Sequence, residues 1–98
     1  MKIYISGAIT GTDDYMDRFA SAQKELAKQG YIAINPAVIN SLLPLDTTHE
    51  QYMQMSFCML DMCDTIYLLN GWEKSMGANQ EYGYALAKGK KILKEENK

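Results

Sequence analysis

The sequence predicts an α/β domain of the three-layer Rossmann-like or flavodoxin-like class, with a four-stranded parallel sheet in the order 2-1-3-4. Two observations favour this fold. Strand-like and helix-like segments alternate along the whole chain, and residues that cap helices or form turns stand between them. The length of 98 residues gives room for one core, so residues 1–98 are assigned to a single domain.

The first half of the chain shows this alternation clearly. Residues 2–6 form a first strand, and Thr12 with the two aspartates after it offers a cap for a helix that runs to about Gln29. Gly30 is the expected stop of that helix, and residues 31–35 form the second strand. The apolar residues of the helix recur at intervals of three and four; they are Tyr15, Phe19, Ala22 and Leu26.

The second half continues the pattern after a less regular segment. Residues 37–46 are irregular or a short helix, and Thr48 with Gln51 forms a capping box for a helix over 49–63. The remaining elements are a strand at 65–69, a helix at about 75–88 and a short strand from Lys91. The last helix has a buried stripe that consists of Ala78, Tyr82, Ala85 and Leu86. Alternating elements of this kind pack helices on both faces of a parallel sheet.

The helix over 49–63 is rich in methionine and has apolar residues on more than one face. A small domain has little protein with which to cover two faces, so we expect a homo-oligomer, a dimer or higher, that associates through this helix. The alternative is a monomer in which the helix is wedged between the sheet and a neighbouring helix. The residues leave both interpretations open.

Composition narrows the functional classes. The net charge of −2, without a basic stripe, argues against a nucleic-acid or anionic membrane partner. The chain has neither an apolar run of about 20 residues nor the features of a signal peptide, so a cytoplasmic location is expected. Cys58 and Cys63 are interpreted as buried free thiols, and His49 has no companion ligands nearby. We therefore expect no metal and no cofactor.

The candidate site lies where the first and third strands end, because ligands bind at the switch point of a doubly wound sheet. That topology brings the turn after the first strand next to the turn that spans 70–77. The first turn consists of Ser6, Gly7, Ala8, Ile9, Thr10 and Gly11. Its GxxxG spacing is neither a dinucleotide fingerprint nor a P-loop, and its glycines serve either anion contact or turn geometry alone. Ser75 either only caps the helix at about 75–88 or also donates its hydroxyl to a phosphate.

Glu81 is the single carboxylate of the third long helix. It lies just beside the buried stripe rather than opposite it. Three interpretations follow from this placement: a solvated carboxylate, a partner in a salt bridge, or a nucleophile that faces the crevice.

Several segments resemble the nucleoside 2-deoxyribosyltransferase superfamily, including its branch of small 2-deoxynucleoside 5-monophosphate N-glycosidases. The segments are IYISGAITG, CDTIYLL and GANQEYGYALAKGKKI, and the phrase GWEKSxGAxxE is shared with short bacterial and phage proteins of that superfamily. The resemblance implies that Glu81 attacks the anomeric carbon of a deoxyribose and that Tyr4 lies near this nucleophile. It also implies that Ser75, Gly77 and the backbone from Gly7 to Gly11 cradle the sugar and its 5-phosphate.

The function implied is cleavage or transfer of the N-glycosidic bond of a deoxynucleoside or its 5-monophosphate through a covalent sugar ester. Two positions depart from the superfamily. Ser56 stands where an aspartate normally handles the proton of the leaving base, and Thr10 stands where the monophosphate glycosidases carry an arginine. The alternative is therefore a non-catalytic protein that binds a nucleotide or nucleotide-sugar. Trp72 either stacks on a base or packs against a neighbouring subunit.

Overall fold

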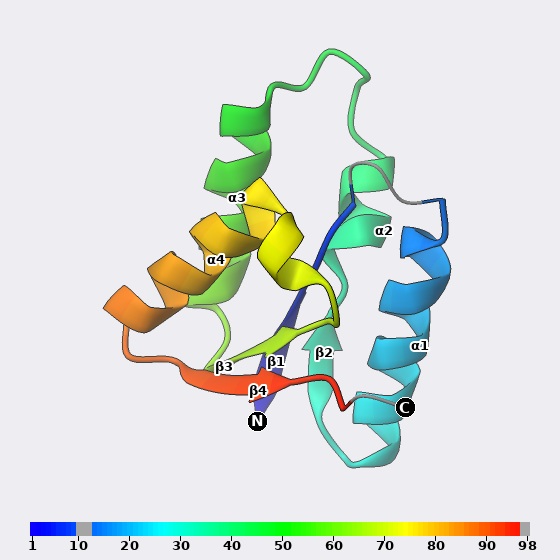
Figure 1. The fold of residues 1–98 in the computed structure, drawn as a ribbon, viewed down its shortest axis with the longest axis vertical. Helices are drawn as coiled ribbons and strands as arrows, with labels where there is room; N and C mark the ends of the chain where they lie inside the picture. The colour runs from blue at the N-terminus through cyan, green and yellow to red at the C-terminus, as the bar shows by residue number, and fades with distance from the viewer. Residues whose placement is uncertain (10–12, 97–98) are drawn as a thin grey trace.

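Four parallel strands in the order β2-β1-β3-β4 form the centre of the molecule, as the sequence predicts (Figure 1). The computed structural model describes residues 1–9 and 13–96. The strands are β1 (Lys2–Ser6), β2 (Ile32–Ile34), β3 (Thr65–Leu68) and β4 (Lys91–Lys94). The helices are α1 (Tyr15–Lys28), α2 (Pro36–Ser41), α3 (His49–Asp61), α4 (Met76–Ala87) and the short 3₁₀ helix η1 (Trp72–Lys74). This arrangement is that of a Rossmann-like fold.

The helices cover the sheet on both faces and make three layers. Helices α1 and α2 pack on one face and α3 and α4 on the other (Figure 1). Successive side chains of a strand point to opposite faces, so Ile3 and Ile5 pack with Phe19 of α1, whereas Tyr4 packs with Leu60 of α3. Burial on both faces explains why β1 is buried from its second residue to its last.

Local signals in the sequence set most of the helix ends. The capping box of Thr48 and Gln51 is formed at the start of α3, and Gly30, with φ of 89°, follows the end of α1. Residues 36–41 form a helix because Pro36 occupies its first position and the side chain of Asn35 accepts a hydrogen bond from the backbone N–H of Ala37 at 3.0 Å.

Several details differ from the sequence prediction. Helix α1 begins only at Tyr15, after an Asp14 N-cap that makes no side-chain capping bond, and the predicted cap Thr12 lies outside the described residues. Cys58 is exposed, because it faces away from the sheet, while Cys63 is buried as expected. Leu86 is 52% exposed, because the buried stripe of α4 turns toward the sheet through Ala78, Glu81 and Ala85 instead.

Helix α3 covers much of its apolar surface within the chain. Met53 and Met59 are buried, and the ring of Phe57 stacks on that of Tyr84 in α4 with centroids 4.3 Å apart. Met62, just after the helix, remains 59% exposed. Association through this helix stays a prediction. Among the described residues, none of the helices has the length and apolar character that a membrane crossing requires.

Candidate functional site

Glu81 lies inside the protein at the carboxyl ends of β1 and β3, with only 8% of its surface exposed. Two hydroxyl groups of β1 hold its carboxylate. The Tyr4 hydroxyl donates to Oε2 and the Ser6 hydroxyl donates to Oε1, each at 2.6 Å. Residues two apart on a strand share one face of the sheet, so β1 presents both donors to the same helix. The inward interpretation of Glu81 is therefore the one that the geometry supports.

The surroundings of Glu81 act on its pKa in opposite directions. Burial raises the pKa above the ordinary range, because a low-dielectric environment disfavours the charged form. Hydrogen bonds from Ser6, Tyr4 and Ser56, and the charge of nearby His49, lower the pKa and so favour the carboxylate. Burial and the negative charge of Glu81 raise the pKa of Tyr4 well above that of a free tyrosine. Tyr4 consequently keeps its proton and remains a donor.

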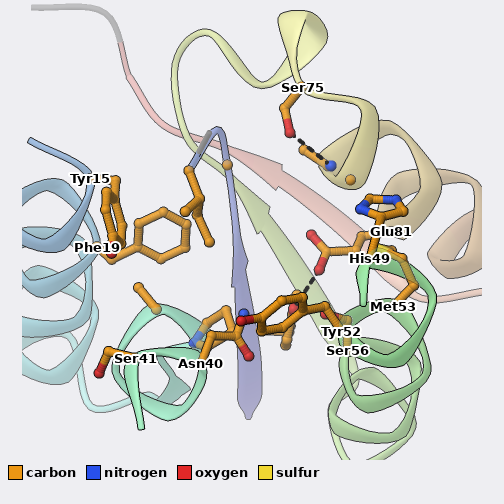
Figure 2. A pocket seen from close by; sticks show the side chains of 17 residues that line it. Tyr15, Phe19, Asn40, Ser41, His49, Tyr52, Met53, Ser56, Ser75 and Glu81 are labelled. Atoms are coloured by element: carbon orange, nitrogen blue, oxygen red, sulfur yellow. Dashed lines mark hydrogen bonds between the residues drawn. The ribbon is translucent and has the colours of Figure 1, made fainter. Parts of the chain in front are cut away.

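A pocket of about 320 Å³ opens above this carboxylate (Figure 2). Its volume lies at the lower end of the range of about 300–1,000 Å³ that is typical of small-molecule sites. Every helix longer than a single turn contributes to its wall: Tyr15 and Phe19 from α1, Pro36, Ala37, Asn40 and Ser41 from α2, His49, Tyr52, Met53 and Ser56 from α3, and Gly77, Ala78 and Glu81 from α4. Tyr4, Gly7, Ile9 and Ser75 complete it. Glu81 is the only carboxylate among the described lining residues, and none of them is a lysine or arginine.

Most of the residues singled out from the sequence meet in this pocket. Seven of them line it; they are Tyr4, Gly7, Ile9, Ser56, Ser75, Gly77 and Glu81. Ser6 supports Glu81 from the strand without lining the pocket, and Ala8 does not line it either. Thr10 and Gly11 lie outside the described residues.

Trp72 does not line the pocket. Its ring packs instead against Tyr82 of the same chain, with centroids 4.8 Å apart. This contact follows from η1, which the sequence did not predict and which turns Trp72 back onto α4. The two expectations for Trp72, stacking on a base and packing on a neighbouring subunit, stay predictions.

Gly7 and Ser75 shape the two turns that border the pocket. A Cβ atom on Gly7 would lie 2.9 Å from both Cβ and Cδ1 of Leu69, so only glycine fits the close approach of the β1 and β3 ends. The Ser75 hydroxyl accepts a hydrogen bond from the backbone N–H of Ala78 at 3.1 Å and caps α4. The N-terminus of this helix therefore faces the pocket, with its dipole suited to negative charge.

Sequence reasoning missed several polar residues of the wall, among them His49, Asn40, Ser41 and Tyr52. His49 forms a hydrogen bond through Nε2 to Gln80 Oε1 at 2.9 Å, so α4 orients its ring. A signal for His49 was present, because positions 49, 53 and 56 lie on one face of α3 at the spacing i, i+4, i+7. Asn40 gave no signal, since its segment was left between irregular structure and a short helix.

The fold and the pocket define an α/β protein with a pocket at the switch point of its sheet and a buried, hydroxyl-held carboxylate in the wall of that pocket. A family model described as "Domain of unknown function (DUF4406)" matches residues 1–94, and the chain belongs to this family. No curated protein matches the chain. Within residues 1–9 and 13–96, the structure forms no group of three or more His, Cys, Asp or Glu side chains placed to hold a metal ion.

Proposed function

We propose that the protein cleaves or transfers the N-glycosidic bond of a deoxynucleoside or its 5-monophosphate, with Glu81 as the nucleophile. The observation that carries this proposal is the Glu81 carboxylate, which is buried, held on both oxygens by hydroxyl groups and placed in the wall of a 320 Å³ pocket. A solvated helix carboxylate would not be buried, and a salt-bridged one would be held by a cationic side chain rather than by two hydroxyl groups. Two 2.6 Å hydrogen bonds fix its orientation before substrate arrives.

The reaction fits the residue. One oxygen of Glu81 forms a bond to the anomeric carbon while the electron pair of the C–N bond leaves with the base, which takes up a proton. The carboxylate becomes a neutral sugar ester, so the charge that burial disfavours is lost as the bond forms. Water then attacks the anomeric carbon and releases the sugar, or a second base attacks and gives a new nucleoside.

His49 is the group we assign to proton transfer. A serine hydroxyl at Ser56 cannot act as a general acid near neutral pH, whereas an imidazole can. His49 lies two turns before Ser56 on the same face of α3, and both line the pocket. Because the bond to Gln80 occupies Nε2, Nδ1 is the atom available to exchange a proton with the base.

The 5-phosphate is the less strongly supported part of the substrate. Among the described lining residues there is no lysine or arginine to clamp it. The backbone near Ser75 and Gly77 at the N-terminus of α4 is the part of the wall suited to an anion. Both the nucleoside and the monophosphate therefore belong in any test.

Base release measured by chromatography tests the proposal directly. Incubation with the common deoxynucleosides and their monophosphates should yield free base, and both Glu81→Ala and Glu81→Gln should abolish it. Glu73→Gln, which changes an exposed glutamate just before α4, is the matched control and should retain the activity. Intact mass spectrometry of the stalled reaction should show a deoxyribosyl adduct on the native protein. Base release that survives both Glu81 substitutions would reject the assignment.

A second candidate is a non-catalytic protein that binds a nucleotide or nucleotide-sugar. Two observations favour it: Ser56 replaces the expected aspartate, and burial favours the neutral form of Glu81, which does not attack carbon. A ligand that binds only the folded form adds about 2.7 kcal/mol of stability at 100 times its Kd. A nucleotide-dependent rise in Tm without any base release would select this candidate over the enzyme.

A further inference from the structure

Asn40 carries a buried polar atom that the fold does not use. Its side-chain oxygen Oδ1 is shielded from solvent, and within residues 1–9 and 13–96 it is the one buried side-chain nitrogen or oxygen without a hydrogen-bond partner. Other buried polar side chains are satisfied; Asn35, for example, caps α2 and contacts Gln23. A buried carbonyl without a partner destabilises a protein, so this atom requires an explanation.

The position of Asn40 supplies one. Asn40 lies in α2 and lines the pocket, and Figure 2 shows its side chain beside Tyr52, on the side of the pocket away from Ser75. Glu81 projects from α4 between these two ends (Figure 2). The pocket therefore has an end suited to an anion, a central carboxylate and an end with an amide group among aromatic side chains.

A nucleoside bound for the proposed reaction can fill these regions in only one favourable direction. Its anomeric carbon must lie at Glu81, and its 5-hydroxyl or phosphate suits the N-terminus of α4 near Ser75. The base then extends toward Asn40 and Tyr52, while Tyr15 and Phe19 of α1 line the wall across from Glu81 (Figure 2). Aromatic rings suit the flat faces of a base, and an amide suits its polar edge.

We propose that Asn40 is a specificity-determining residue that accepts a hydrogen bond from the exocyclic amino group of the base through Oδ1. This inference rests on the proposed function only for the direction in which the nucleoside lies. Because Oδ1 is shielded in this structure, the amide must turn toward the cavity when the base binds, and Oδ1 can then accept from a donor that protrudes from the ring, as an exocyclic amino group does. The amide nitrogen can then donate to the adjacent ring nitrogen, and adenine and cytosine carry this pair of groups on the base edge that lies away from the sugar.

Pairs of ligands that differ only in the amino group test the proposal. Dissociation constants and base release are measured for deoxyadenosine and its analogue with an unsubstituted purine, and for deoxycytidine and its analogue without the 4-amino group. The native protein should favour the amino-bearing member of at least one pair by about 10-fold or more, since the loss of a hydrogen bond leaves Oδ1 unpaired again. Asn40→Ala and Asn40→Leu should bring this ratio close to one.

Stability gives an independent readout. Asn40→Leu removes an unpartnered polar atom, so its Tm should equal or exceed that of the native protein. Asn79 is the contrasting control, because its amide donates to the backbone oxygens of Glu73 and Ser75 at 2.9 and 2.8 Å. Asn79→Ala should lower Tm.

The outcomes separate this inference from the proposed function. If the preference for the amino-bearing ligand falls close to one in both Asn40 variants while no base is released, Asn40 is supported as a binding residue and the enzymatic function is rejected. Base release that depends on Glu81 but shows the same ratio in native protein and Asn40 variants would reject the role of Asn40 alone. Failure of all four ligands to bind, or a Tm of Asn40→Leu lowered as by a core defect, would also overturn it.

Discussion

Removing the Tyr4 hydroxyl tests the reasoning about the site most directly. Tyr4→Phe keeps the fully buried ring and deletes only the donor that lies 2.6 Å from Glu81 Oε2. A hydrogen bond to a charged group contributes about 1.5–3 kcal/mol, roughly twice a neutral one. In a domain of this size each kcal/mol shifts Tm by about 4–8 °C, so we expect Tm at neutral pH to fall by about 6–24 °C.

The loss of stability in Tyr4→Phe should depend on pH, and the direction of this dependence follows from the pKa of Glu81. Burial raises the folded-state pKa of Glu81 above its unfolded value, so at a pH between these two values the native state binds more protons than the unfolded state. The contribution of Glu81 to stability therefore decreases as pH rises from about 4.3, the unfolded value, through the folded pKa. Tyr4 lowers that pKa, so Tyr4→Phe raises it further and widens the window. The difference in unfolding free energy should be largest near neutral pH and shrink to about 0.5–1.5 kcal/mol near pH 4, where the bond is neutral.

The measurement is urea unfolding of both proteins at a series of pH values. Tyr84→Phe is the matched control, because it deletes a hydroxyl that donates to a carboxylate oxygen of Asp61 at 2.8 Å in an exposed position. It should leave stability nearly unchanged at every pH, since water replaces the lost partner. A loss in Tyr4→Phe that equals that of the control, or that is the same at pH 4 and pH 8, would refute the buried-carboxylate interpretation.

Three further predictions address the turns and the proton donor. Gly7→Ala should lower the free energy of unfolding by about 1–3 kcal/mol, because its methyl group meets the buried Leu69 side chain. The control Gly83→Ala places no atom within 4 Å of the new carbon and should raise the free energy of unfolding by about 0.5–1 kcal/mol. Urea unfolding measures both changes. Ser56→Asp should leave the rate of base release largely unchanged, because His49 already transfers the proton, and should lower Tm, because it buries a second carboxyl group. A rate raised by about 10²–10⁴ would contradict the role of His49. His49→Ala should lower kcat by about 10²–10⁴ while KM changes little, and equal kcat values in native and variant protein would remove His49 from the mechanism.

Much of the fold could be predicted from local patterns. The period of apolar residues set the type of each long element, and caps such as Thr48 and Gly30 set where helices begin and end. The order of strands followed from the right-handed crossovers that parallel strands require. The limits appeared where short-range signals were weak, as in η1 and in α2. Seven of the predicted site residues line the pocket, and among them the resemblance places Glu81 and Tyr4 together.

By itself the sequence determined the alternation of elements, the strand order and the crevice that this order creates, because periodicity and capping are properties of neighbouring residues. Only the tertiary structure decided which way the side chains of that crevice face. Glu81 lies 77 residues after Tyr4 and 75 residues after Ser6 along the chain, and these contacts depend on the register of β1 and the rotation of α4. The same long-range packing turned Trp72 onto Tyr82 and brought His49 and Asn40 to the pocket. No local pattern encodes such contacts, since they arise when separate elements pack against a common sheet.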